Sequence, residues 1–366
     1  MKLPLVYALH SGNLYGTERM ALATAANLAD EFEPVIFAPP GPALGEAARM
    51  GFAAEAFTSP LEFAWKVRPH LSRHRRLAFV ATGVTHSLAC LAWNKLYRRD
   101  VVHLHMVHGG TDEALSYGRK RRLNGAPVTF VAVSGFVRER LIANGVAPGQ
   151  IAVIENFLPD RQIAAAPKRA GFAGPGARRL IVISRVDPIK RLDVLLDALD
   201  RHPELNDLSI SIYGTGWQLD EMRARAAASH PNVTFAGFHN DVAGELAQAD
   251  LLVHTCPEEP FGLAIIEAMA ARVPVLVPDS GGAGSLVEEG VSGFRFAANQ
   301  ADSLAARLRE LRDAPAELLN RVVAGAQHAL ATRFSAHART NDYRRLLSAT
   351  GSASGAELQT IPEGNA

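Results

Sequence analysis

Residues 250–277 constrain the fold more than any other part of the chain. The apolar run at residues 250–255 predicts a buried strand, and residues 273–277 predict a second one. Between them, residues 263–271 are good helix formers, and Pro260 and Gly262 loosen the backbone just before the helix begins. We therefore expect a strand, a loop, a helix and a parallel strand, with the loop opening at the carboxyl end of the first strand.

This loop combines free backbone amides with two glutamates. The first amides of a helix lack intrahelical partners, so those at Phe261, Gly262 and Leu263 suit a phosphate. Glu259 precedes the helix and Glu267 lies about one turn inside it, so both carboxylates can face one crevice. A carboxylate accepts two hydroxyl donors, and we expect sugar hydroxyls as its partners. The alternative is a solvated loop glutamate beside a glutamate on a surface helix.

The length and composition predict two domains of the α/β class. A chain of 366 residues is long for one core, and 48% hydrophobic residues with only 7% aromatic ones favour aliphatic cores. The 38 Lys and Arg residues balance the 37 Asp and Glu residues, so nothing in the overall charge favours nucleic acid as a partner. Any basic function must therefore be local.

The cysteines and the apolar runs predict a cytoplasmic protein. Cys90 and Cys256 lie far apart and match no metal-ligand spacing, so we interpret them as reduced thiols. The short apolar run at residues 3–9 reads as a first strand, because a signal peptide needs a longer run. No uncharged apolar run approaches the roughly 18 residues of a membrane span. Membrane contact would be peripheral, at the inner membrane face.

The first half of the chain alternates strands and helices, which predicts a doubly wound parallel sheet. A glycine-bearing loop with Gly12 and Gly16 joins the first strand to an alanine-rich helix, and its spacing is not that of a dinucleotide fingerprint. It either brings backbone close to a ligand or forms a tight turn without ligand contact. Further strands are expected at residues 34–38, 77–82, 101–107, 128–134 and 151–157.

Three histidines accompany the strand at residues 101–107. His103 and His105 alternate with apolar residues and share one face of the strand, whereas His108 stands at its end beside two glycines. Two histidines in a buried strand more often form hydrogen bonds inside the fold than bind a metal, and no carboxylate follows at ligand spacing. We therefore predict no metal site here.

Two basic runs leave alternatives open. The run at residues 66–76 suits an anionic acceptor, a membrane surface or, more simply, a solvated helix face. The run from Arg119 to Arg122 either lines an acceptor groove or is exposed.

The second half begins with a strand at residues 180–184, followed by Arg185 and Lys190, and further strands are expected at residues 210–216, ending in a Gly-x-Gly turn, and at 233–238. Two cations five residues apart, after a strand and before a helix, would reach the crevice that Glu259 faces. They suit a diphosphate, since Arg185 can bind it in a bidentate way and Lys190 supplies a mobile point charge. A surface ion pair is the alternative.

Two glutamates separated by seven residues, with Phe-Gly-Leu between them and Glu-Ala-Met-Ala at the end, resemble the signature of the retaining glycosyltransferases of family 4. That resemblance implies the GT-B architecture, which consists of two Rossmann-like doubly wound domains with a cleft between them. Gly16 and Glu18 match the family's first glycine loop, although Tyr15 replaces one glycine. Ser184, Arg191 and Ser285 stand where the family usually has glycine, glycine and glutamate.

The resemblance also implies roles for individual residues. Arg185 and Lys190 would stabilise the diphosphate, Glu259 the donor-sugar hydroxyls and Glu267 the ribose diol. His108, or His105 if the alignment shifts, would contact the donor sugar from the first domain. The remaining donor-site candidates are Gly214, Phe238 and His239 near the nucleotide, and Gly16 in the first domain.

The resemblance and the composition together predict the domain boundaries. We expect an acceptor-binding domain at residues 1–165, an alanine, proline and glycine-rich linker at 166–176, and a nucleotide-sugar domain at 177–333. A last helix at residues 334–347 is expected to cross back to the first domain, and a polar, glycine-rich tail at 348–366 to be disordered.

These features predict a retaining hexosyltransferase. It would move a sugar from a UDP- or GDP-sugar to a hydroxyl of a glycan or lipid-linked acceptor, in bacterial cell-surface polysaccharide or glycoconjugate synthesis. The chain has no Asp-x-Asp motif, so we expect no obligatory metal and no cofactor beyond the donor substrate. The alternatives are a GT-B nucleotide-sugar epimerase and a non-catalytic partner that binds sugar nucleotides.

Overall fold

The computed structural model describes residues 2–110, 112–239 and 241–348. It divides into two compact units, Met1–Asn156 with Ala336–Ala366 and Phe157–Ser335. The sequence predicted that the first domain would end at residue 165. In the structure the first unit ends at Asn156, so the helix α7 (Asp160–Ala165) belongs to the second unit. Of the tail expected to be disordered, residues 349–366 lie outside the described residues.

The first unit is built on a seven-stranded parallel sheet in the order β3-β2-β1-β4-β5-β6-β7. Its strands are β1 (Leu3–Ala8), β2 (Phe32–Ala38), β3 (Ala53–Ala56), β4 (Arg76–Ala81), β5 (Asp100–Val107), β6 (Thr129–Ala132) and β7 (Ile151–Val153). Its helices are α1 (Gly16–Leu28), α2 (Pro42–Arg49), α3 (Pro60–Arg73), α4 (Val84–Tyr97), α5 (Glu113–Ser116), α6 (Gly135–Ala143) and α15 (Ala336–Ser348), with 3-10 turns η1 (Gly118–Leu123) and η2 (Pro148–Gln150).

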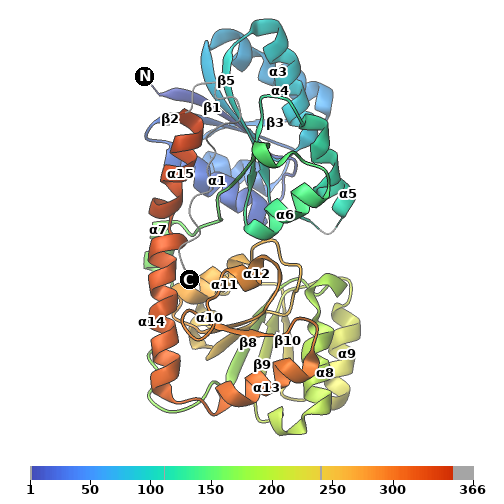
Figure 1. Ribbon diagram of the computed structural model, residues 1–366, viewed down its shortest axis with the longest axis vertical. Helices are drawn as coiled ribbons and strands as arrows, with labels where there is room; N and C mark the ends of the chain where they lie inside the picture. The colour runs from blue at the N-terminus through green and yellow to red at the C-terminus, as the bar shows by residue number, and fades with distance from the viewer. Residues whose placement is uncertain (1, 111, 240, 349–366) are drawn as a thin grey trace. The chain divides into compact units, whose positions relative to one another are not determined.

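The core of this unit depends on the helical period of the apolar residues of α3. Phe63, Val67 and Leu71 recur every four residues on α3 and form an apolar stripe that packs on buried side chains of β1, β2 and β4. Helix α3 lies beside α4, and α15 lies beside α1 (Figure 1). Arg344 of α15 pairs with Asp30 and Glu31 at 2.6 and 2.7 Å, so the last helix is part of the first unit.

The second unit is built on a six-stranded parallel sheet in the order β10-β9-β8-β11-β12-β13. Its strands are β8 (Arg179–Ile183), β9 (Ser209–Tyr213), β10 (Val233–Gly237), β11 (Leu251–Val253), β12 (Val275–Pro278) and β13 (Phe294–Phe296). Besides α7, its helices are α8 (Leu192–Arg201), α9 (Leu219–Ser229), α10 (Ala243–Gln248), α11 (Leu263–Ala270), α12 (Gly281–Ser285), α13 (Ala301–Arg312) and α14 (Ala316–Arg333), with 3-10 turns η3 (Pro188–Lys190) and η4 (Pro203–Leu205).

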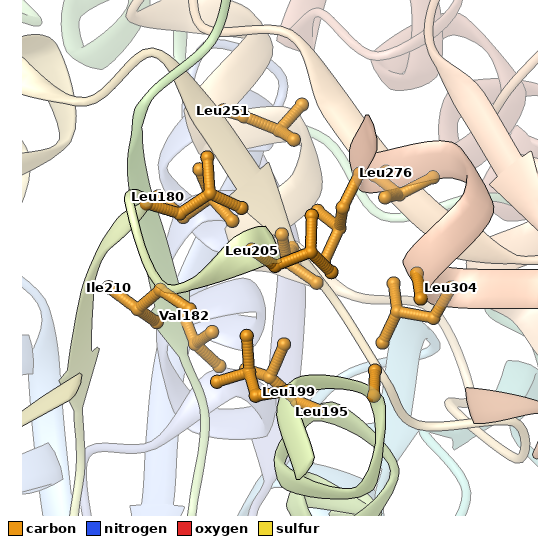
Figure 2. Close-up of a cluster of buried hydrophobic side chains, with 14 of the residues drawn as sticks. Leu180, Val182, Leu195, Leu199, Leu205, Ile210, Leu251, Leu276 and Leu304 are labelled. Carbon is orange, nitrogen blue, oxygen red and sulfur yellow. The ribbon is translucent and has the colours of Figure 1, made fainter. Parts of the chain in front are cut away.

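Aliphatic side chains between this sheet and two helices form the second core. Leu195 and Leu199 of α8 and Leu304 of α13 belong to one cluster with Leu180 of β8 and Leu276 of β12 (Figure 2). The central strands β8, β11 and β12 are largely buried on both faces and therefore read as continuous apolar runs in the sequence. None of the helices in the described part of the chain is both long and apolar enough to span a bilayer.

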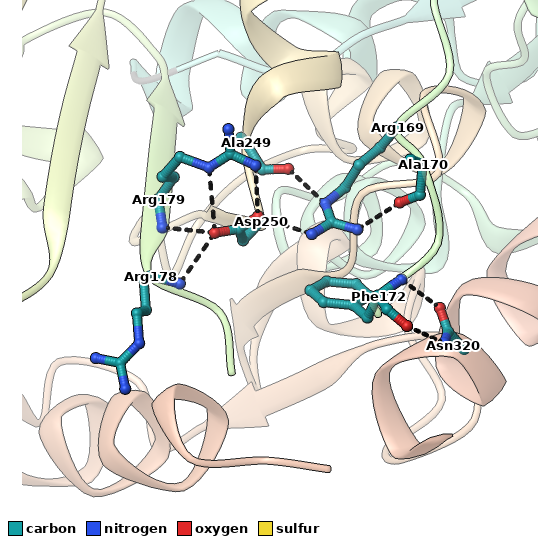
Figure 3. Close-up of polar contacts among 8 residues, drawn as sticks. All are labelled: Arg169, Ala170, Phe172, Arg178, Arg179, Ala249, Asp250 and Asn320. Carbon is teal, nitrogen blue, oxygen red and sulfur yellow. Dashed lines mark hydrogen bonds and ion pairs between the residues drawn. The ribbon is translucent and has the colours of Figure 1, made fainter. Parts of the chain in front are cut away.

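A buried carboxylate fixes the start of the second sheet. Asp250 accepts hydrogen bonds from the backbone amides of Arg178 and Arg179 at 3.1 and 2.9 Å, and from the guanidinium of Arg169 at 2.7 Å (Figure 3). Burial alone would raise the pKa of Asp250, but the hydrogen bonds from Arg179 and Arg169 lower it to about 2. Asp250 therefore joins the beginnings of β8 and β11.

The segment expected to be a linker, residues 166–176, lies within the second unit. Arg169 donates to the carbonyl of Ala249 at 3.0 Å, and its guanidinium lies over the ring of Phe172 (Figure 3). Asn320 of α14 exchanges two hydrogen bonds with the backbone of Phe172, at 2.9 and 3.0 Å. The composition predicted flexibility, but these contacts fasten the segment to the second unit.

We predict that Asp250→Ala lowers the free energy of unfolding of the second unit by about 3 kcal/mol or more, because it leaves the guanidinium of Arg169 buried without a carboxylate partner. Asp207→Ala is the matched control, since Asp207 pairs with Arg178 at the surface, where such pairs contribute about 1 kcal/mol or less. Urea denaturation followed by circular dichroism measures both. Equal midpoints for the two variants would contradict the assigned role.

The same carboxylate predicts a pH dependence. Its pKa is lowered from 3.8 in the unfolded chain to about 2, so its stabilising contribution is fully present above about pH 4 and is lost as the pH falls toward 2.

Candidate functional site

The site forms where the strand order of the second sheet reverses. From β8 the chain continues to β9 and β10 on one side, then returns to β11 on the other side of β8. In parallel sheets, ligands bind outside the carboxyl ends of the strands at such a reversal. Arg185 and Lys190 follow β8, and Glu259 follows β11, so the topology brings the predicted cations and the predicted carboxylate together.

Lys190 and Glu259 form a nearly buried ion pair. The Nζ of Lys190 donates to Oε2 of Glu259 at 2.5 Å, and the two side chains are only 15% and 14% exposed. Burial alone would raise the pKa of Glu259, but Lys190 holds it well below its usual range. Burial alone would lower the pKa of Lys190, and the Glu259 carboxylate reverses this and raises it. Both groups are therefore charged at neutral pH.

Two further contacts hold this pair in place. The hydroxyl of Thr255, just after β11, donates to the backbone carbonyl of Lys190 at 2.6 Å. His254 Nε2 lies 3.3 Å from the same oxygen of Glu259, without the geometry of a hydrogen bond. From the sequence, we assigned His254 no role. It could have been identified as a site residue because it stands at the end of a buried strand, just before the loop that carries Glu259.

Arg185 is the exposed cation of the site, whereas Lys190, which the sequence led us to expect as a mobile charge, is held in the ion pair. Its guanidinium is 59% exposed and contacts the buried carboxylate of Asp187 at 2.7 Å. Asp187 in turn accepts a hydrogen bond from the amide of Trp217 at 3.2 Å, which positions the turn after β9. A ligand phosphate can therefore reach Arg185 from solvent while its stem stays fixed.

Glycines hold the site loops at close range. Gly214 has a φ of 143°, and a Cβ there would lie 1.9 Å from the carbonyl oxygen of Ser184. Gly282 donates its amide to the carbonyl of Glu259 at 2.6 Å, and a Cβ there would lie 2.2 Å from the carbonyl oxygen of Pro260. Larger residues at either position would displace the loop that carries Arg185 or the loop that carries Glu259.

The start of α11 lies beside the ion pair. Gly262 is the N-cap residue and Leu263 begins the helix, and no described residue accepts a hydrogen bond from the amides of Phe261, Gly262 or Leu263. The Phe261 side chain is buried against Phe334, so this residue can offer its backbone and not its ring. Glu267 lies in the second turn of α11 and is partly buried.

The remaining candidates of the second unit lie at the end of β10. Phe238 is 61% exposed, and the ring of His239 packs edge-on against Tyr213 at a centroid distance of 5.1 Å. The nearest charged partner of His239 is Glu245 at 3.7 Å. These residues are separated from Lys190 by β9, and Tyr213 is a neighbour that the sequence analysis did not single out.

One candidate of the first unit, His108, lines a cavity. A hollow of about 380 Å³ is lined by His10, Thr17 and His108, which follow β1, open α1 and follow β5. Gly16 is the first residue of α1 and precedes Thr17, and the predicted partner Glu18 is buried with its carboxylate accepting the amide of Tyr15 at 3.1 Å.

The structure separates His108 from the other two histidines of β5. Ser87 Oγ lies 2.9 Å from His105 Nδ1 and 3.0 Å from His103 Nε2, so both rings form hydrogen bonds inside the fold, as predicted. His105 is completely buried, whereas His108 lines the cavity. The geometry therefore favours His108 over His105 as a ligand contact.

Within the described residues, His254, Cys256 and Glu259 have ligand atoms close enough to share a metal ion. Lys190 already occupies the Glu259 carboxylate with a positive charge. Burial raises the pKa of the Cys256 thiol to about 11, so the thiolate that a metal requires is disfavoured. These donors fit a metal poorly.

Comparisons with known proteins agree with this geometry. The family model described as Glycosyltransferase Family 4 matches residues 15–161, and the model described as Glycosyl transferases group 1 matches residues 168–329. The chain belongs to glycosyltransferase family 4. A phosphatidyl-myo-inositol mannosyltransferase of Mycobacterium leprae is 30% identical over 164 residues, which cover 43% of this chain and 44% of that protein.

A D-inositol 3-phosphate glycosyltransferase of Streptomyces bingchenggensis is 31% identical over 260 residues, which cover 58% of this chain and 56% of that protein. The chain thus spans about half the length of the curated relatives it matches. Anabaena HepE in complex with UDP superposes with a TM-score of 0.79 at 22% identity, over 95% of this chain and 100% of that chain. The fold of this family 4 member is GT-B, as predicted.

We predict that Lys190→Met destabilises the second unit at pH 7 by about 3 kcal/mol, because it leaves the Glu259 charge buried and unpaired. Adding Glu259→Gln should restore part of that loss. The pKa of Glu259 is lowered in the parent protein, so the pair stabilises above the usual carboxylate pKa and its contribution is lost as the pH falls. The gap in melting temperature between parent and Lys190→Met should therefore be largest near neutral pH. A gap that widens on acidification would contradict the ion-pair assignment.

Proposed function

We propose that this family 4 protein is a retaining glycosyltransferase. It transfers a sugar from a nucleoside-diphosphate donor to a hydroxyl of a glycan or lipid-linked acceptor, in bacterial polysaccharide or glycoconjugate synthesis. The observation that carries the proposal is the buried Lys190–Glu259 pair beside the exposed guanidinium of Arg185 and the free amides of α11. Cations and amides suit the diphosphate, and the carboxylate suits sugar hydroxyls.

In this mechanism the protein stabilises the leaving group. As the bond between the anomeric carbon and the phosphate oxygen breaks, negative charge grows on the diphosphate, where Arg185, Lys190 and the amides at residues 261–263 receive it. The acceptor oxygen forms its bond to the anomeric carbon on the same face, and its proton passes to the departing phosphate oxygen. This step requires no protein base.

The other predicted residues orient the donor. Glu259 holds hydroxyls of the transferred sugar through its carboxylate, which Lys190 and His254 keep charged. Glu267 accepts from the ribose diol, and Gly214, Phe238 and His239 surround the base. From the first unit, His108 contacts the sugar, beside the loop that ends at Gly16.

We propose that no cofactor and no obligatory metal are needed. Arg185 and Lys190 supply the positive charge that a divalent cation would otherwise provide, and Lys190 competes with any cation for Glu259. An epimerase would need acid and base groups at the sugar and no acceptor site, and the family membership does not favour it.

The donor base is a matter for experiment. One relative is named a GDP-mannose-dependent mannosyltransferase, and HepE was crystallised with UDP-glucose. A panel of UDP-, GDP- and ADP-sugars and free nucleotides should raise the melting temperature by several degrees for one base only. Arg185→Ala should abolish this shift, and the exposed Arg201→Ala should leave it unchanged. No shift with any nucleotide would overturn the proposal.

The roles of single residues are testable in the same format. Removing the 2′-hydroxyl of the nucleotide should weaken binding to the parent protein by about 10-fold, and should make no further difference in Glu267→Ala. With the active donor, Lys190→Met should reduce kcat by about 100-fold or more. If removing the 2′-hydroxyl weakens nucleotide binding to Glu267→Ala as much as it does in the parent protein, Glu267 does not bind the ribose.

We also propose that the protein is cytoplasmic and contacts membranes peripherally through α3. Part of the basic run at residues 66–76 is engaged in surface ion pairs, since Lys66 pairs with Glu62 and Arg76 with Asp100. The exposed Trp65, with Arg68 stacked over its ring, offers an amphipathic contact for a lipid headgroup region. Cosedimentation with anionic vesicles should fall when Trp65 is changed to Ser. Equal binding by parent and variant would exclude this surface.

A further inference from the structure

The cavity of the first unit has a lining of unusual composition. Its sixteen residues include the cations Arg119, Lys120 and Arg122 and the histidines His10 and His108. Among these residues there is no Asp, Glu, Asn or Gln. Carboxylate and carboxamide groups are the strongest side-chain acceptors for sugar hydroxyls, and the hydroxyl acceptors that the lining does contain are those of Thr17, Thr82, Thr85 and Ser116. The lining instead offers donors and positive charge, which complement an anion.

The three cations are not neutralised by neighbouring acids. In the part of the chain that the structure describes, no carboxylate forms an ion pair with Arg119, Lys120 or Arg122. The two acidic residues just upstream are engaged elsewhere. Asp112 accepts the amide of Leu115 at 2.9 Å, and Glu113 binds Arg140 at 2.5 Å.

Lys120 is the most constrained of these cations. It is 9% exposed, and its Nζ donates to the carbonyl of Leu115 at 3.2 Å. Burial lowers its pKa to about 8, and the charge of Arg119 adds to the effect. A buried ammonium with one neutral acceptor and a like charge beside it is stabilised when an anion occupies the cavity.

Helix α4 adds backbone donors to the same cavity. Gly83, Val84 and Thr85 form its first turn and line the cavity, and the helix extends over 14 residues. No described residue accepts a hydrogen bond from the amides of Val84 or Thr85. Free amides and the positive end of a helix dipole are a binding site for phosphate.

His108 supplies an independent sign of a missing partner. Its Nε2 is buried and has no hydrogen-bond partner among the described residues. Burial lowers its pKa to about 4, so the ring is neutral at physiological pH and adds no charge to the lining. The lining thus provides charged side chains and backbone amides for one anionic group.

We propose that the first unit binds a phosphate ester, the anionic group of the acceptor, in the cavity lined by Arg119, Lys120, Arg122 and the start of α4. The identification of this ligand as the acceptor rests on the proposed glycosyltransferase function. The partly exposed Leu88 and Leu115 also line the cavity and would contact the organic part that the phosphate carries. A soluble sugar phosphate and a lipid phosphate share this chemistry.

The basic run offers its own control. Arg121 lies between Lys120 and Arg122 in η1 but is exposed and does not line the cavity. The variants Arg119→Gln, Lys120→Met and Arg122→Gln remove lining charges, whereas Arg121→Gln removes the same charge from the same turn outside the cavity. Each of the four variants removes one positive charge. A larger loss of binding in the three lining variants than in Arg121→Gln would therefore show that binding needs the lining side chains and not only a positively charged surface.

Calorimetric titration of the full chain tests the proposal with two probes, glycerol 3-phosphate and farnesyl phosphate, and with glycerol and farnesol as neutral counterparts. We expect both phosphates to bind, and each lining variant to weaken them by about 10-fold or more. Arg121→Gln should stay within about twofold of the parent, and the neutral alcohols should be insensitive to all four variants. Equal affinity for both phosphates assigns recognition to the phosphate alone, and tighter farnesyl phosphate binding assigns a lipid source.

Two results would overturn the site. One is that the parent binds neither phosphate, and the other is that Arg121→Gln weakens binding as much as the lining variants do. Arg185→Ala separates this test from the proposed function, since it removes nucleotide binding in the second unit and should leave phosphate binding intact. If nucleotides bind and phosphates do not, only the acceptor inference fails. If phosphates bind and nucleotides do not, the glycosyltransferase proposal fails and the anion site remains.

Discussion

A buried ammonium and a buried carboxylate, 2.5 Å apart, are the interaction on which the candidate site depends. Neither charge would be stable alone at that depth, so Lys190 and Glu259 must be brought together by the fold or not be buried at all. The strand order does this, because β8 and β11 are neighbours although two strands separate them in the chain. Asp250 holds the beginnings of those two strands, and the ion pair joins the loops at their ends.

The two units place different chemistry at the carboxyl ends of their sheets. In the second unit, cations alternate with carboxylates, which suits a sugar attached to a diphosphate. In the first unit, the cavity is cationic and lacks carboxylates and carboxamides, which suits an anion. The same parallel-sheet architecture can therefore serve two ligands, because the loops at the strand ends, and not the sheets, carry the chemistry.

Much of the fold could be predicted from the sequence, because buried parallel strands are continuous apolar runs. The strands at residues 180–184 and 273–277 were predicted within a few residues of β8 and β12 for this reason. Two strands were not predicted, and their sequences explain why. The residues of β3 are Ala-Ala-Glu-Ala, which have low strand propensity at a sheet edge, and β13 has only three residues.

The sequence could predict those site residues that directly follow strands, because the ends of adjacent parallel strands lie close together in space. Arg185, Lys190 and Glu259 follow strands that meet at a reversal of strand order, so their types and positions were sufficient. His254 and the cavity role of Arg119, Lys120 and Arg122 were not decided by the sequence, because burial and lining depend on how loops pack. The apparent linker at residues 166–176 misled for a related reason, since its composition does not reveal the contacts of Arg169 with Asp250 or of Phe172 with Asn320.

The most direct test of the central claim is a crystal structure of the full chain with the nucleoside diphosphate that stabilises it. We expect the terminal phosphate to contact Arg185, Lys190 and the amides at the start of α11, with the ribose on Glu267. A diphosphate bound elsewhere, with Lys190 and Glu259 paired and neither touching the ligand, would show that this ion pair is not part of the donor site.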